Sequence, residues 1–156
     1  MQEFADQHPA LFFCLVFPTM WVLVGFLIAL VGGWSQLAGR YRTEREFPQH
    51  KRWLQSAQMR FTIGYNSVLT LASDSEGLCM GVITPFRMGH PPLFIPWTAI
   101  QVEEPKRYMF FMSRMLRLGP DAIPLRLRQR TAQFLLEPRG AASVPVAGTI
   151  SSSFSS

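Results

Sequence analysis

The sequence is poor in the residues from which enzymes build recognisable sites. It contains two cysteines and three histidines, and neither cysteine has a second cysteine or a histidine at metal-ligand spacing. It has no P-loop, no glycine-rich dinucleotide turn, and no HExxH or GxSxG motif. We therefore expect a protein that is not an enzyme and that uses no metal and no cofactor.

The two cysteines are also unlike a disulfide pair. Cys14 lies in a long apolar segment and Cys79 in a predicted strand, so we expect both to act as small apolar residues. A domain without disulfides is typical of the cytoplasm.

Charge of one sign is not concentrated in any block. Lys+Arg number 15 against 10 Asp+Glu, and the sequence pI is about 9.9. The basic residues are thinly spread and no nucleic-acid-reading motif accompanies them. Because net charge alone says little about partners, we expect no nucleic-acid partner.

The most informative feature that is present is an apolar run over residues 10–31, in which only Thr19 is clearly polar. As a helix it is roughly 33 Å long at about 1.5 Å per residue, against a hydrocarbon core of about 30 Å. A cleaved secretory signal has a positive start and a shorter apolar run. We therefore expect an uncleaved transmembrane helix over residues 10–33.

The flanking charges predict how this helix is oriented. Residues 1–9 carry Glu3 and Asp6, whereas residues 40–52 carry five basic residues against two acidic ones. Lys and Arg close to a span stay on the cytoplasmic side. We expect the N-terminus outside and the domain in the cytoplasm, and the alternative topology places the domain outside.

Residues 34–48 predict a juxtamembrane amphipathic helix, with Trp34, Leu37 and Tyr41 on one face and Pro48 at its end. Two interpretations are equally open. The helix either lies near the lipid headgroups, with Trp34 and Tyr41 as interfacial anchors, or extends the anchor and packs on the domain.

Residues 53–137 predict a small, mainly β domain, an antiparallel sheet or roll. Strand-like runs occupy residues 67–73, 78–84, 93–103 and 115–130, and Gly119 to Ala122 form the turn of the last hairpin. Pro96 places its strand at an edge or bulge. Residues 131–137 predict one or two helical turns, and residues 138–156 have the composition of a disordered tail.

Two surfaces are candidate binding sites. The first is a basic sheet face made by Arg117, Arg126, Arg128 and Arg130. Near a membrane, each such side chain contributes about 1 kcal/mol of attraction to anionic lipid headgroups. A merely solvated sheet face is the more common explanation of such a pattern.

The second candidate surface is the loop over residues 85–92 and the strand that follows. If exposed, Arg87 and His90 supply polar contacts and Leu93 or Phe94 an apolar one. His90 has no second ligand nearby, so a loop histidine hydrogen-bonded to backbone is the simpler interpretation. We expect Ile95, Trp97 and Ile100 in the core and Asp74 and Glu76 in a turn.

This loop carries a resemblance to known proteins, on the residues Phe86, Arg87, Gly89, His90, Pro91, Pro92, Leu93, Ile95, Pro96 and Trp97. With the upstream WSQLAGRYR, the chain over roughly residues 34–100 resembles a group of bacterial single-pass membrane proteins with an FRxGHPPLxIPW stretch. That group has no assigned activity, so the resemblance implies a bacterial inner-membrane location but no functional residue. More loosely, the β domain resembles PH-like and GRAM-like domains, which bind lipids or proteins, although its C-terminal helix is shorter than theirs.

These observations predict a single-pass membrane protein whose cytoplasmic β domain binds a partner protein or the leaflet surface without catalysis. One alternative is a small accessory subunit that acts through its transmembrane helix, where Gly25 and Gly32 allow close helix approach. Another is an enzyme with an unfamiliar site at His90. The sequence predicts no oligomeric state.

Overall fold

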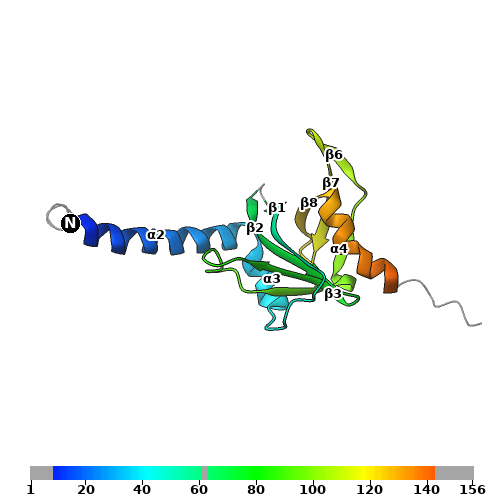
Figure 1. Ribbon diagram of the computed structural model, residues 1–156, viewed down its shortest axis with the longest axis horizontal. Coiled ribbons are helices and arrows are strands. Elements are labelled where there is room, and N and C mark those ends of the chain that lie inside the picture. Colours follow the sequence, from blue (N-terminus) through cyan, green and yellow to red (C-terminus); the bar gives the residue numbers. More distant parts are fainter. Residues whose placement is uncertain (1–8, 61–62, 143–156) are drawn as a thin grey trace, which may run out of the picture.

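The computed structural model describes residues 9–60 and 63–142. A long helix, α2 (Pro9–Val31), projects from a compact β domain, and the C-terminal helix lies on the side of the domain opposite to it (Figure 1). The segment Ala10–Val31 of α2 has a mean hydropathy of 2.5, so it is long and apolar enough to cross a membrane. Its polar Thr19 hydroxyl donates to the Leu15 carbonyl within the helix, 2.7 Å away.

The domain is built on one eight-stranded antiparallel sheet, ordered β4-β3-β2-β1-β8-β7-β5, with β6 also paired to β7. The strands are β1 (Lys51–Gln58), β2 (Gly64–Ser73), β3 (Gly77–Val82), β4 (Leu93–Pro96), β5 (Ile100–Val102), β6 (Lys106–Tyr108), β7 (Phe111–Leu118) and β8 (Ile123–Arg128). The predicted antiparallel sheet is thus confirmed.

The two edges of this sheet come from one stretch of chain. Residues 93–103 were expected to form a single strand, but the 3₁₀ turn η2 (Trp97–Ala99) divides them into β4 at one edge and β5 at the other. Pro96, which has no N–H to donate to a ladder, ends β4 as expected of an edge position. Since only three residues separate β4 from β5, the sheet curls so that its two edges come close to each other at η2.

The inner face of the curled sheet forms the core. Alternate residues of the last hairpin point inward, as predicted: Leu116 and Leu118 on β7, and Ile123, Leu125 and Leu127 on β8, are all almost fully buried. Ile95, Trp97 and Ile100 are also in the core, as expected. The hairpin turn closes with a hydrogen bond from the Ala122 N–H to the Gly119 carbonyl.

The juxtamembrane helix is shorter than predicted and belongs to the domain. Helix α3 (Trp34–Tyr41) ends at Tyr41, because Arg42 is already extended and forms a bridge with Leu93, while the Thr43 N–H donates to the Pro92 carbonyl. Trp34 is fully buried and Leu37 nearly so. Of the two interpretations left open, packing on the domain is the one observed, and Trp34 is not an interfacial anchor.

The C-terminal helix is longer than predicted. Helix α4 (Gln129–Ala142) runs through Pro138, so the first part of the expected tail is helical, while residues 143–156 lie outside the described residues. Pro138 leaves the Phe134 carbonyl without its usual helical donor. The His50 Nε2 lies 2.9 Å from that carbonyl and takes the donor's place, with the His50 ring stacked on the Phe134 ring.

Candidate functional site

The loop between β3 and β4 packs against the membrane-type helix. The Trp21 and Phe86 rings lie 5.2 Å apart. A Cβ at Gly25 would lie 3.4 Å from the Met88 carbonyl oxygen, and a Cβ at Gly89, whose φ is +77°, would lie 3.2 Å from the Phe26 ring. The absence of side chains at both glycines therefore lets the loop and α2 approach closely.

Gly32 is likewise used inside the molecule. A Cβ at this position would meet the Ile28 carbonyl oxygen at 2.8 Å and the Tyr65 hydroxyl at 3.1 Å. Gly25 and Gly32 thus both face the domain of their own chain. This removes the observation on which close approach to a second transmembrane helix was based.

Behind the loop, three aromatic rings from three elements form a buried cluster: Trp34 from α3, Tyr65 from β2 and His90 from the loop. Their centroids lie 5.2–5.7 Å apart. The Trp34 indole N–H donates to the Pro91 carbonyl, 3.0 Å away. This aromatic cluster connects the juxtamembrane helix, the sheet and the loop that contacts α2.

His90 has both ring nitrogens occupied in this cluster. Nδ1 lies 3.0 Å from the Met88 carbonyl, and Nε2 lies 3.0 Å from the Tyr65 hydroxyl. A carbonyl only accepts, so Nδ1 carries the proton and Nε2 accepts from Tyr65. Burial lowers the pKa of His90 and raises that of Tyr65, so both groups are held in their neutral forms.

This packing leaves some of the predicted loop-surface residues exposed and buries the others. Arg87 is exposed and Phe94 is half-buried beneath the Arg45 guanidinium, 5.0 Å from the ring centroid. Leu93 is fully buried, and His90 is 3% exposed. Leu93 and His90 therefore hold the loop from beneath and do not offer a binding surface. The large hydrophobic side chains that the loop exposes are Phe86 and Met88.

Three of the four arginines predicted to form a basic sheet face lie on the sheet. The strand register pairs Arg117 with Pro124, Arg126 with Met115 and Arg128 with Ser113, all on the outer face of the sheet. Arg117 is taken up by an ion pair with Glu103. Arg130 lies in the first turn of α4 and not on the sheet.

Two depressions gather the remaining arginines. A wide one of about 740 Å³ is lined by Arg52, Arg128 and Arg130, and also by Phe111 and Met112. A smaller one of about 160 Å³, which we name the basic depression, is lined by Ser56, Gln58, Asn66, Arg126 and Arg128. No carboxylate is among the described residues that line either one.

An apolar groove of about 350 Å³ lies where α2 meets the domain. Its walls are Val24 and Ile28 of α2, Tyr65 and Val68 of β2, and Phe86 and Met88 of the loop. Asn66 lines this groove and also the basic depression, so the two are neighbours on either side of this residue.

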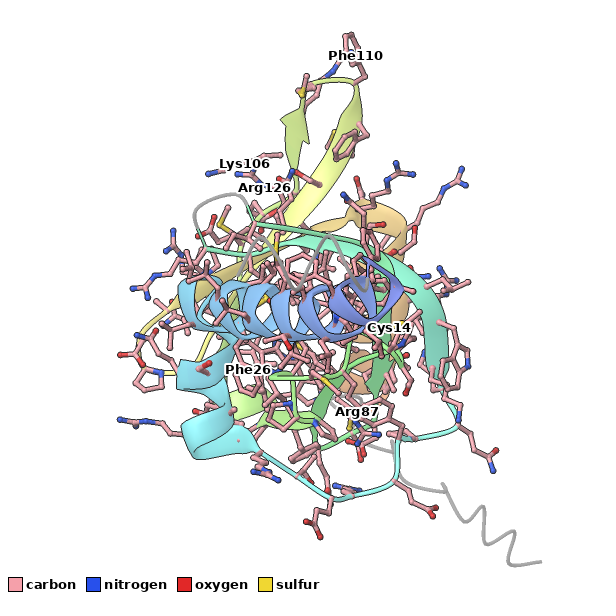
Figure 2. All side chains as sticks on the ribbon, turned by 90° about the vertical axis from the view of Figure 1, so that its left-hand side faces the viewer. Cys14, Phe26, Arg87, Lys106, Phe110 and Arg126 are labelled. Carbon is pink, nitrogen blue, oxygen red and sulfur yellow. The ribbon has the colours of Figure 1, made fainter. Side chains whose placement is uncertain are left out.

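A second exposed apolar surface is the tip of the β6–β7 hairpin. Phe110 is 91% exposed, and Met109, Phe111 and Met112 beside it are also exposed. In Figure 2, Phe110 lies farthest from α2, with Arg126 and Lys106 between them, while Arg87 lies on the other side of α2.

The Cys79 thiol and the Asp74 carboxylate have structural roles. Cys79 is buried, which raises the pKa of its thiol to about 11. Asp74 accepts the Glu76 and Gly77 N–H groups, as a turn residue does. Over residues 9–60 and 63–142, no group of three His, Cys, Asp or Glu side chains is arranged to hold a metal.

No protein-family model, curated protein or solved structure matches the chain. The candidate site is therefore defined by its own geometry.

Sequence reasoning did not find Tyr65, Asn66 or the groove. Tyr65 shares the inward face of β2 with Leu69 and Leu71, and this alternation is the only signal that places it in the core. The groove has no local signal, since its walls come from three segments far apart in the chain.

Proposed function

We propose that this protein is a bacterial single-pass membrane protein whose cytoplasmic β domain is a non-enzymatic module seated on the inner leaflet. The observation that supports it is the packing of the 85–90 loop on α2. Trp21 lies ten residues before Val31, which is about 15 Å along the helix. The apolar helix is barely longer than a hydrocarbon core of about 30 Å. The loop at Trp21 is thus brought into the leaflet.

The side chains of the loop suit that position. Phe86 and Met88 are exposed apolar residues beside the span, where lipid replaces water as their surroundings. Arg87 between them is exposed, and its aliphatic stem is suited to cover apolar surface. Arg40, Arg42 and Arg45 follow the span and favour a cytoplasmic domain.

The strand order and the C-terminal helix support a PH-like fold. Four sequential antiparallel neighbours, β1 to β4, are followed by β5 to β8 and a terminal helix. The departure noted from sequence, a helix of only residues 131–137, is smaller in the structure, where α4 has 14 residues.

Site-directed spin labelling of the full chain in bilayers tests the seat on the leaflet. The variants are Phe86→Cys and, as a matched control, Ser75→Cys, which is exposed in the turn after β2. The control position is far from the groove beside α2. Strand β2 begins at Gly64, which lines that groove, and ends nine residues later at Ser73, about 30 Å away. A Cys14→Ala background suffices, because Cys79 is buried and its thiol is not reactive.

We expect the label at residue 86 to collide with oxygen and to be protected from a water-soluble nickel chelate, and the label at residue 75 to behave in the opposite way. Equal access of the chelate to both positions would contradict the proposal. In inverted membrane vesicles, an impermeant thiol reagent should modify Ser75→Cys, whereas modification only in right-side-out cells would place the domain outside.

A second candidate function is the capture of a partner protein through the β6–β7 hairpin tip. Contiguous exposed apolar residues such as Met109 and Phe110 are typical of interaction sites. The hairpin extends across the direction of α2 (Figure 1), so it is positioned for a neighbour beside the domain.

A further inference from the structure

The apolar groove runs along the membrane-type helix. Its α2 wall runs from Trp21 to Ile28, within the apolar segment that ends at Val31. If the domain is seated as proposed above, on which this inference rests, the groove opens into hydrocarbon. A groove of about 350 Å³ is within the size range of ligand sites, and its apolar walls suit an acyl chain.

The basic depression lies on the outer face of the sheet, and the strand pairing places it near this groove. Gln58 on β1 pairs with Gly64 on β2 and with Arg126 on β8. Adjacent strands are about 4.8 Å apart, so Arg126 is about 10 Å from Gly64, a residue of the groove. Asn66 lines both spaces.

The charges of the depression favour an anion. Arg126 and Arg128 both line it, with Ser56, Gln58 and Asn66 as polar neighbours and no carboxylate among its described lining residues. The Arg126 guanidinium already donates to the Gln58 Oε1, 3.5 Å away, so the phosphate would join an existing polar network. Guanidinium groups bind phosphate with directed hydrogen bonds. An apolar groove beside a basic depression has the two chemistries of an anionic phospholipid.

We propose that this surface binds one anionic glycerophospholipid of the surrounding leaflet, with an acyl chain in the apolar groove and the phosphate at Arg126 and Arg128. The lipid joins α2 to the β domain, because its chain contacts the span and the loop while its headgroup contacts the sheet.

The test is native mass spectrometry of the full chain, extracted in mild detergent from bilayers with equal amounts of phosphatidylglycerol and phosphatidylcholine. Val24→Trp fills the groove, and Leu23→Trp, on a neighbouring lipid-exposed position outside it, is its control. Arg126→Gln with Arg128→Gln removes the headgroup contacts. Lys106→Gln with Arg107→Gln removes the same charge from exposed positions of β6.

We expect the wild-type chain and both controls to retain one phosphatidylglycerol in preference to phosphatidylcholine. Val24→Trp should lose both lipids. The variant with both Arg126→Gln and Arg128→Gln should retain lipid, but its preference for phosphatidylglycerol should fall by roughly 30-fold. Each basic group is expected to contribute about fivefold, and the two factors multiply.

Three results would overturn the lipid site. These are no retained lipid on the wild-type chain, equal effects of Val24→Trp and Leu23→Trp, or a dimer that Val24→Trp dissociates, which would assign the groove to a second copy. The spin label at residue 86 separates failure of the lipid site from failure of the proposed function. If the label is protected from the nickel chelate but no lipid is retained, only the lipid site is overturned. If the chelate reaches the label, both the site and the proposed function are overturned.

Discussion

His90 lies where α3, β2 and the 85–92 loop meet, and its role follows from burial. Both ring nitrogens are bonded, to the Met88 carbonyl and the Tyr65 hydroxyl, while Trp34 packs on the ring. A group in this position holds the loop in place against α2. From the sequence, a loop histidine hydrogen-bonded to backbone is the simpler interpretation, and the Met88 carbonyl supplies such a bond.

The burial of His90 predicts a pH-dependent stability. Its pKa in the folded chain is lowered below the ordinary 6.5, so the unfolded chain binds a proton first as the pH falls. The contribution of neutral His90 to the free energy of unfolding is complete above pH 6.5. It is lost as the pH falls toward the pKa of the folded chain, by about 1.4 kcal/mol for each pH unit in that window.

Thermal unfolding of the full chain between pH 7.5 and 5 measures this effect. We expect His90→Gln to be less stable than the wild type at pH 7.5 and to show a flatter dependence on pH. Parallel pH curves for the two proteins would show that another group is responsible.

At the scale of elements, α4 depends on a side chain from the other end of the domain. Pro138 cannot donate to the Phe134 carbonyl, and His50 Nε2 occupies that position at 2.9 Å. The Arg52 guanidinium lies 4.1 Å from the centroid of the same Phe134 ring. The start of β1 and the segment before it therefore hold the second half of α4.

We expect His50→Ala to cost about 1 kcal/mol and to speed amide exchange in α4 beyond Phe134, since a helix carbonyl loses its partner. Hydrogen exchange measured by mass spectrometry follows this directly. Adding Pro138→Ala should restore protection, because the new N–H donates to Phe134. If the double variant exchanges as fast as His50→Ala, the stacked ring and not the hydrogen bond is what stabilises the helix.

At the scale of the whole molecule, the domain boundary does not lie at residue 53 as the sequence predicts. Trp34 and Leu37 of α3 are in the same core as the sheet. The residues between α3 and β1 also pack on it, since a Cβ at Gly81 would meet the Phe47 ring at 2.8 Å. The folded unit therefore begins near Gly33.

We expect a chain that starts at residue 53 to show no cooperative unfolding, because loss of a buried Trp alone costs about 3–5 kcal/mol out of a typical 5–15 kcal/mol. In the full chain, Trp34→Ala should lower the unfolding temperature far more than Trp53→Ala, since Trp53 is 57% exposed. Near-UV circular dichroism during heating measures both. Equal shifts of the unfolding temperature would show that Trp34 is not part of the core, and would favour a position of α3 at the membrane surface.

Local patterns were enough for the elements whose stability is local. The apolar length of α2, the Gly119–Ala122 turn and the inward alternation of β7 and β8 were all predicted, because each depends on neighbours in sequence. The division of residues 93–103 was missed because it depends on how the whole sheet curls. The burial of Leu93 and the helical path through Pro138 were missed for the same kind of reason, since their partners lie in distant segments.

The sequence by itself determined that this chain has one membrane-type helix, an antiparallel β domain and an arginine-rich last hairpin, because hydropathy, side-chain alternation and turn chemistry act over a few residues. Only the tertiary structure decided which of these surfaces meet. Packing of the 85–90 loop on α2 buries His90 and creates the apolar groove, and strand pairing places Arg126 beside that groove. Both depend on contacts between residues more than 60 positions apart, such as Trp21 with Phe86 and Gln58 with Arg126, which no local pattern encodes.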